Sequence, residues 1–361
     1  MNKKKSLLDI KKLPVIVMDI HIKKGNILLF LGRFKEAEKS FTIMLRLAKG
    51  FSESTYEGIA CSRLGRVFYL MASYKRSLEH LKHARAIFEN QKDRGNLALC
   101  WETIGCVHRI QGRYGEALKC HNNALQLKKE LGDEIPIANS VNTIGHTYWI
   151  MGKYDEALKY LRKALSVFKK FNFLYGESVC LNNLGLVYSE LKLYEKAEKS
   201  YGRSLRIRRK IGDLAGIAAV YLNFGLVYCG RRKFSKAISS WKETIIICEK
   251  TGARDVVSMC QTNLGEVYIV QKKYDKAIKI LKDSLKIKIK LNLGAYLPSS
   301  YTKLATAHYL KYREEKRRAL LLLAKKYADK AFCKAQKIGH KVKIREAKEI
   351  LETIMQTMKK K

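Results

Sequence analysis

The chain has 361 residues and is strongly basic, with 72 Lys and Arg against 33 Asp and Glu and a formal net charge of +39. Hydrophobic residues make up 47% of it, which is enough for a continuous core, but charges interrupt every apolar stretch before it reaches membrane-spanning length. The composition therefore excludes a protein with a transmembrane helix.

The chain begins with a basic segment, MNKKKSLLDIKKLPVIVMDIHIKK, which has the positive start of a secretory signal. Its apolar run is short and is interrupted by Asp19, His21 and Lys23, so it lacks the apolar core that a signal peptide requires. We interpret residues 1–13 as a basic lead-in to the first helix.

A small residue recurs every forty positions after this lead-in. The series consists of Gly25, Gly65, Gly105, Gly145, Gly185, Gly225 and Gly265, followed by Ala305. A period held without slippage means that each unit is one supersecondary element stacked on the next. The sequence therefore predicts a solenoid and not a globule with a single pocket.

Other positions follow the same period and show what each unit contains. Nine residues after the glycine an aromatic residue recurs at Phe34, Tyr74, Tyr114, Tyr154, Tyr194, Phe234 and Tyr274. Three residues further on, small residues recur at Ala37, Ser77, Ala117, Ala157, Ala197, Ala237 and Ala277, with a second, mostly small set seven residues later. These spacings place both sets on one face of a second helix, where small side chains let two backbones approach closely. Each repeat is thus predicted to be a helical hairpin.

The array is predicted to span residues 14–310, with seven glycine-bearing repeats and the start of an eighth. Prolines are rare, so pairs such as Gly132-Asp133, Gly212-Asp213 and Gly252-Ala253 are expected to set the turns between units. Residues 311–361 break the period, because Ala328 follows Ala305 by 23 residues instead of 12. We interpret them as an irregular last hairpin with an insertion of eleven residues, followed by a capping helix.

The repeat resembles that of the tetratricopeptide family. Segments such as LGRVF, IGHTY and LGLVY, followed by GRYGEAL, GKYDEAL and KLYEKAE, are similar to its Leu-Gly-x-x-Tyr and Tyr-x-x-Ala signature. The forty-residue unit departs from the family's usual thirty-four toward a longer-helix subclass that includes the Pins-type polarity adaptors and kinesin light chains. The resemblance implies an all-α, right-handed solenoid of about eight antiparallel helical hairpins, with an inner groove lined by the first helix of each hairpin.

No catalytic or metal-binding pattern is present in the sequence. The nine cysteines never form a Cys-x-x-Cys pair, and Cys100, Cys180 and Cys260 share one slot, five residues before their glycine, where cysteine acts as a small hydrophobe. No glycine-rich phosphate loop appears either. We therefore predict a protein that is not an enzyme and has no cofactor, and the free thiols favour a reducing cytoplasm.

The residues two before and one and four after each glycine are best placed to face the groove. The first row is polar and contains Lys23, Arg63, Asn183, Asn223, Asn263 and Lys303, and Asn142 and Asn182 lie one position earlier. An amide can both donate to and accept from a peptide backbone, so we predict that these asparagines bind an extended polypeptide. We expect Lys23, Arg63, Arg66, Arg109 and Lys303 to contact its carboxylates. The alternative is that the asparagines link neighbouring helices.

The positive charge is spread through the repeats and favours an anionic partner. We predict an adaptor that binds an acidic polypeptide in the concave groove. The alternative is a nucleic-acid-binding array that uses a basic convex surface, where Arg206, Arg208 and Arg209 lie on a second helix. A purely structural role and a lysine-rich proteome bias are also open, and the sequence does not indicate the oligomeric state.

Overall fold

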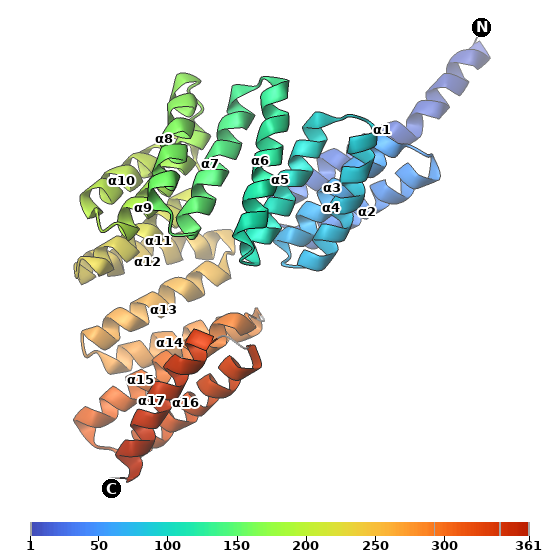
Figure 1. The fold of residues 1–361 in the computed structure, drawn as a ribbon. Coiled ribbons are helices and arrows are strands. Elements are labelled where there is room, and N and C mark those ends of the chain that lie inside the picture. Colours follow the sequence, from blue (N-terminus) through green and yellow to red (C-terminus); the bar gives the residue numbers. More distant parts are fainter. Residues whose placement is uncertain (1, 292, 339–340, 360–361) are drawn as a thin grey trace. The chain divides into compact units, whose positions relative to one another are not determined.

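The structure, a computed structural model, describes residues 2–291, 293–338 and 341–359 (Figure 1), with side chains for 13–29, 31–291, 293–337 and 342–359. All regular elements in these residues are helices. They are α1 Asn2–Phe30, α2 Phe34–Gly50, α3 Ser54–Leu70, α4 Tyr74–Asn90, α5 Arg94–Ile110, α6 Tyr114–Leu131, α7 Glu134–Ile150, α8 Tyr154–Lys170, α9 Leu174–Glu190, α10 Tyr194–Ile211, α11 Leu214–Gly230, α12 Phe234–Thr251, α13 Arg254–Val270, α14 Tyr274–Lys290, the 3-10 turn η1 Gly294–Tyr296, α15 Leu297–Glu315, α16 Arg318–Ile338 and α17 Lys341–Lys359. Within the described residues, consecutive helices pair from α1/α2 to α7/α8 in unit 1 and from α11/α12 to α15/α16 in unit 2, which confirms the predicted all-α solenoid of helical hairpins.

The chain divides into two compact units, Met1–Val187 and Tyr188–Lys361, and the division falls inside α9. Unit 1 has a core of stacked apolar side chains such as Phe41, Phe68 and Leu81. Unit 2 is built in the same way around residues such as Trp241 and Leu281. None of the described helices combines the length and the apolar character that a bilayer crossing requires.

The periodic glycines allow the two helices of a hairpin to pack closely. A Cβ atom added at Gly65 would lie 2.5 Å from Leu81 Cγ, and one at Gly225 would lie 2.2 Å from Trp241 Nε1. Carbon atoms in contact are normally about 3.5–4.0 Å apart, so a larger residue would force the helices apart. This close approach is the physical reason why a small residue recurs at this position of each repeat.

The predicted turn residues end and begin helices as expected. Gly132, Gly212 and Gly252 adopt the left-handed conformation, with φ of 81°, 71° and 77°, at the C-termini of α6, α10 and α12. Asp133 then accepts a hydrogen bond from Ile135 N, and Asp213 accepts one from Gly216 N, at the starts of α7 and α11. Each aspartate satisfies a free N–H group at a helix N-terminus.

The two ends of the array differ in detail from the sequence-based interpretation. The predicted lead-in comprised residues 1–13. Residues 2–13 form the start of α1, which passes through Pro14, whereas residue 1 and the side chains of residues 1–12 lie outside the described part. At the other end, the prediction of an eleven-residue insertion was wrong. Helix α14 begins nine residues after Gly265 and α16 begins thirteen after Ala305, so only four residues are inserted.

The error arose because Ala328 occupies the second small slot of its helix and not the first. It lies ten residues after the start of α16, as Ser284 lies ten residues after the start of α14. The first slot holds Leu321, a larger residue that is buried against Ile354 of α17.

Candidate functional site

Three arginines lie on first helices of unit 1, where the repeat pattern places them. Helix α3 buries Leu64, Val67 and Phe68 in the core, so Arg63 and Arg66 lie outside that packed face. Arg109 lies near the end of α5, where it is partly buried. We call the surface formed by the exposed and half-buried residues of α3, α5 and α7 the first-helix face of unit 1.

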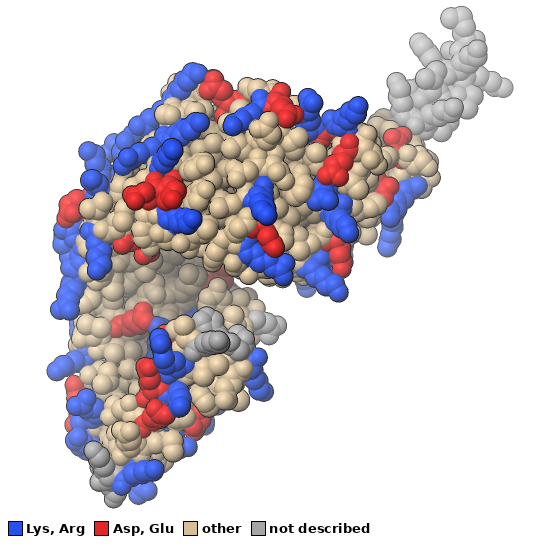
Figure 2. Space-filling view, viewed as in Figure 1, with Lys and Arg blue, Asp and Glu red and all other residues tan. Residues whose placement is uncertain are grey.

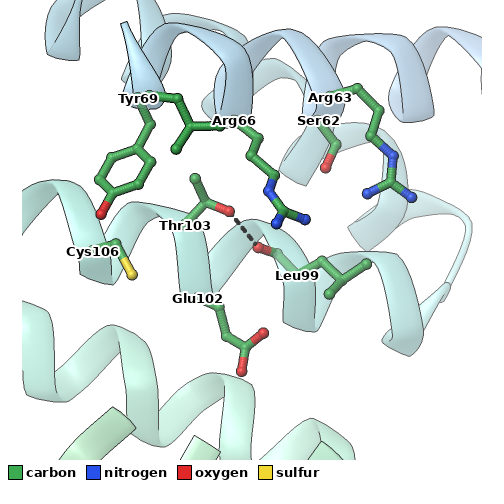
Figure 3. Close-up of a pocket in the computed structure, with 9 residues that line it drawn as sticks. Ser62, Arg63, Arg66, Tyr69, Leu99, Glu102, Thr103 and Cys106 are labelled. Carbon is green, nitrogen blue, oxygen red and sulfur yellow. Dashed lines mark hydrogen bonds between the residues drawn. The ribbon is translucent and has the colours of Figure 1, made fainter. Parts of the chain in front are cut away.

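A pocket of about 270 Å³ opens between α3 and α5 on this face (Figure 3). Its lining consists of Ser62, Arg63, Arg66, Tyr69, Leu70, Leu99, Glu102, Thr103 and Cys106. In Figure 3 the side chains of Arg63 and Arg66 extend from α3 toward α5. The pocket thus has two guanidinium groups at its edge.

The only carboxylate in the pocket lining is already engaged. Glu102 Oε1 accepts a hydrogen bond from Lys128 Nζ at 2.5 Å and another from Ser140 Oγ at 2.8 Å. Among the residues that the structure describes, no carboxylate forms an ion pair with Arg63, Arg66 or Arg109. The positive charge of the pocket is therefore uncompensated.

Burial adds to the effect at Arg63. Desolvation, together with the nearby charge of Arg66, lowers the pKa of the Arg63 guanidinium, and its buried Nε has no hydrogen-bond partner within the described part of the chain. A buried donor without a partner costs about 1–3 kcal/mol. An anionic acceptor bound beside Arg63 would offset this cost.

Arg109 lies beside a histidine that does not compensate its charge. Arg109 Nη1 is 3.3 Å from His146 Nδ1, and burial followed by the charge of Arg109 lowers the pKa of His146 to about 4. The imidazole is thus neutral near pH 7 and accepts the hydrogen bond. The repeat pattern alone does not predict a role for His146, although this residue directly follows Gly145 as Arg66 follows Gly65.

The structure shows that two of the predicted asparagines bind each other. Asn183 Nδ2 donates to Asn142 Oδ1 at 3.1 Å, and Asn183 is buried. This bond connects α7 with α9, as in the alternative of helix-linking amides. Asn182 and Asn223 are half-buried and interact with other groups of the chain, and Asn263 is half-buried on α13.

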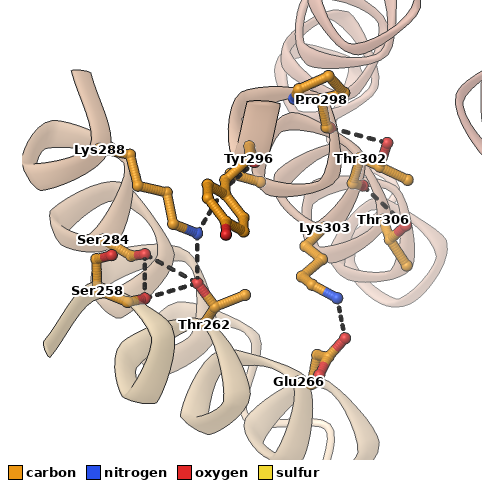
Figure 4. A network of polar contacts seen from close by, with 11 residues as sticks. Ser258, Thr262, Glu266, Ser284, Lys288, Tyr296, Pro298, Thr302, Lys303 and Thr306 are labelled. Atoms are coloured by element: carbon orange, nitrogen blue, oxygen red, sulfur yellow. Dashed lines mark hydrogen bonds and ion pairs between the residues drawn. The ribbon is translucent and has the colours of Figure 1, made fainter. Parts of the chain in front are cut away.

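The two predicted lysines differ in environment. Lys23 is exposed on α1 in unit 1. Lys303 of unit 2, on α15, forms an ion pair with Glu266 of α13 (Figure 4), and burial lowers its pKa. A ligand carboxylate at Lys303 would have to compete with Glu266.

A second polar cluster in unit 2 contains a buried ammonium group. Lys288 Nζ donates to Thr262 Oγ1 at 2.7 Å and to Ser300 Oγ at 2.8 Å (Figure 4). Burial, with a smaller effect from Lys343, lowers the pKa of Lys288 to about 8. Lys288 lies four repeats, or 160 residues, after Lys128, and Thr262 lies four repeats after Glu102. Lys288 is therefore bound to a hydroxyl group at the position where Lys128 is bound to a carboxylate.

The basic outer surface is less continuous than the sequence indicated. Lys and Arg side chains are distributed over the visible faces of both units with Asp and Glu among them (Figure 2). Arg208 is buried, and its Nη1 donates to Asp213 Oδ2 at 2.7 Å, so its assignment to the convex face was wrong. Arg206 and Arg209 are exposed.

The family follows from comparison with known proteins. A tetratricopeptide repeat model matches residues 58–130, 96–170, 134–210 and 216–290, which together cover more than half of the sequence. The chain belongs to the tetratricopeptide repeat family. This membership supports a protein-interaction scaffold. A search of curated proteins found no match.

Solved structures with the same fold share little sequence with the chain. A Rap protein complexed with competence and sporulation factor is 15% identical, with 95% of this chain and 98% of that chain covered and a TM-score of 0.61. The STAND protein with a tetratricopeptide repeat sensor from Pyrococcus horikoshii is 17% identical, with 94% of this chain and 49% of that chain covered and a TM-score of 0.63. BtubC from P. vanneervenii is 22% identical, with 61% of this chain and 90% of that chain covered and a TM-score of 0.50. At these identities the likeness shows the fold alone.

Proposed function

We propose that the protein is a scaffold whose first-helix face in unit 1 binds an extended, acidic polypeptide segment. The observation that carries this proposal is that Arg63, Arg66 and Arg109 lack carboxylate partners within the described residues, while Glu102 is held by Lys128. Hydrogen bonds between guanidinium and carboxylate groups are strong and directional. Acidic side chains would supply the missing partners, and the positive field would steer them toward the site.

In unit 2, we propose that Asn223 and Asn263 hydrogen-bond to the backbone of a bound segment. Both lie two residues before their glycine, and both are half-buried. Asn223→Ala should weaken binding without loss of helix content, as circular dichroism would show. Unchanged affinity in a folded Asn223→Ala variant would remove this residue from the site.

The charge part of the proposal is tested with a fluorescein-labelled decaglutamate peptide. Anisotropy titrations would compare the parent with Arg66→Glu, and with Arg206→Glu as a matched control, because both arginines are exposed. Loss of a contact between guanidinium and carboxylate is worth about 1.5–3 kcal/mol. We therefore expect roughly a tenfold or larger loss of affinity for Arg66→Glu and less than a twofold loss for Arg206→Glu.

Equal losses for the two variants would mean that the peptide responds only to net charge, and would overturn the proposed site. The same variants, with Arg209→Glu, would also be titrated with a labelled single-stranded RNA 20-mer. Tight, strongly salt-dependent RNA binding that Arg206→Glu and Arg209→Glu weaken would instead favour nucleic-acid binding through the second helices.

Two further observations support a polypeptide partner in a reducing compartment. The Rap protein of similar fold forms a complex with competence and sporulation factor. The cysteines of the chain are free, and most of them are buried. We propose a cytoplasmic location, where thiols remain reduced.

A further inference from the structure

Helix α1 exposes a face that is buried in all the later repeats. Ile20 and Ile27 are 55% and 60% exposed. Equivalent positions, or slots, recur every forty residues. The slot of Ile20 holds Ala60, Cys100, Ser140, Cys180, Val220, Cys260 and Ser300, and the slot of Ile27 holds Val67, Val107, Thr147, Val187, Val227, Val267 and Ala307. All of these later residues are at most 1% exposed. The first repeat alone leaves both slots open.

The second helix of the preceding repeat covers these slots. Ala60 and Val67 of α3 pack in one cluster with Phe41 and Met44 of α2. The thiol of Cys180, on α9, donates to Leu161 O of α8 at 3.0 Å. In unit 2, residues of α12 cover the same slots of α13. On α1, at the N-terminal end of the described chain (Figure 1), the exposure of Ile20 and Ile27 shows that no described residue covers the corresponding face.

The exposed face is a narrow apolar stripe. On α1 it consists of Leu13, Ile16, Ile20 and Ile27, each at least 52% exposed. At 3.6 residues per turn these four positions fall within about 60° of the helix circumference. Leu13, Ile20 and Ile27 are seven residues apart, which is the spacing of a coiled-coil seam. A stripe of this width fits one helix, whereas a helix that lies on a membrane presents a broader apolar face.

The charge around the stripe indicates the kind of helix that it accepts. Of the residues of α1 whose side chains the structure describes, 13–29, two are lysines, Lys23 and Lys24, and both are exposed, while the one carboxylate is that of Asp19. Asp19 accepts a hydrogen bond from Tyr56. A second copy of α1 would bring the same positive charge against it, but a helix with acidic flanks would be attracted.

We propose that α1 is a docking surface for an amphipathic helix of a partner protein, with an apolar stripe and acidic flanking residues. The partner helix takes the place that the second helix of a preceding repeat occupies elsewhere in the array. This surface is separate from the pocket between α3 and α5, and the proposal does not depend on the function proposed for that pocket.

The probe is a stapled peptide with the sequence of α8, Tyr154–Lys170, because α8 covers these slots on α9. In the acidic form its five lysines and arginines are replaced by glutamate, and the unmodified basic sequence is the control. The staple is needed because an isolated helix of this length is marginal in water. Binding would be measured by fluorescence anisotropy with the full chain.

We expect the acidic peptide to bind the parent at least tenfold more tightly than the basic peptide does. Ile20→Glu and Ile27→Glu should each weaken it by tenfold or more. Ile110→Glu is the matched control, since Ile110 is also in unit 1, is 49% exposed and undergoes the same charge change, and it should alter affinity less than twofold. Arg66→Glu should also have little effect, which separates this surface from the pocket.

Several results would overturn the proposal. They are absence of acidic-peptide binding, equal binding of the basic peptide, and equal loss for Ile110→Glu. Dimerisation of the parent in sedimentation runs that Ile20→Glu abolishes would assign the stripe to a second copy. Binding to phosphatidylserine vesicles that both isoleucine variants abolish would assign it to a membrane surface. Two variants are used so that misfolding of one, seen by circular dichroism, does not remove the test.

Discussion

Replacement of Gly225 by alanine tests the physical basis of the repeat. The added Cβ would lie 2.2 Å from Nε1 and 2.5 Å from Cε2 of Trp241, well inside van der Waals contact. Trp241 is 1% exposed, and its Nε1–H donates to Leu222 O at 3.2 Å. The indole ring therefore has no free space to move into, and α11 and α12 must separate.

The expected magnitude follows from three opposing effects. Overpacking of a filled core costs about 1–3 kcal/mol. Loss of the indole hydrogen bond adds about 0.5–1.5 kcal/mol. Alanine gains about 1 kcal/mol over glycine in a helix interior. The net loss is about 0.5–3.5 kcal/mol, which for a unit of this size lowers Tm by roughly 1–14 °C.

Gly202→Ala is the matched control. Gly202 also lies in a helix of unit 2, α10, but a Cβ there would meet no atom within 4 Å. Only the helix-propensity term remains, so Gly202→Ala should raise the stability by about 0.5–1 kcal/mol. Thermal melts by circular dichroism, together with fluorescence, measure both changes, and Trp241 is the only tryptophan of unit 2.

The sign of the difference decides the outcome. A Gly225→Ala protein that is as stable as Gly202→Ala would show that the periodic glycine is not required for helix approach. The explanation given above for the recurring glycine would then be wrong.

Three further predictions follow from buried groups. Burial lowers the pKa of Lys288 from its ordinary 10.5 to about 8, so between these pH values the unfolded chain binds more protons than the folded one, and the stability due to this group rises with pH. Lys288→Met should therefore lose part of the rise in Tm that the parent shows from pH 8 to 10. An equal change of Tm with pH in the parent and the variant would contradict this. Glu102→Gln should lower the free energy of unfolding in urea by about 1–3 kcal/mol because the ammonium group of Lys128 loses its carboxylate partner, and an unchanged midpoint would argue against that pair. A thiol reagent should label exposed Cys333 first in the native protein, and Cys333→Ser should remove that fast phase, whereas a fast phase that persists would place another thiol at the surface.

The sequence by itself determined the helical hairpins and their number. A period of forty residues, with small residues at fixed offsets, specifies which face of each helix is packed, because neighbours on a helix face are only three or four residues apart. Turn residues such as Gly132 and Asp133 also act within a few positions of their place in the chain. Local rules of this kind can be read without coordinates.

Only the tertiary structure decided which charged and polar groups remain available. Glu102 is held by Lys128, 26 residues away, and Asn183 binds Asn142, 41 residues away. These partners lie on different helices, so their meeting depends on helix positions and side-chain rotamers that no periodicity specifies. The same holds for the exposed stripe of α1: Ile20 occupies a position that is buried in the later repeats, and only the structure shows that it is 55% exposed here.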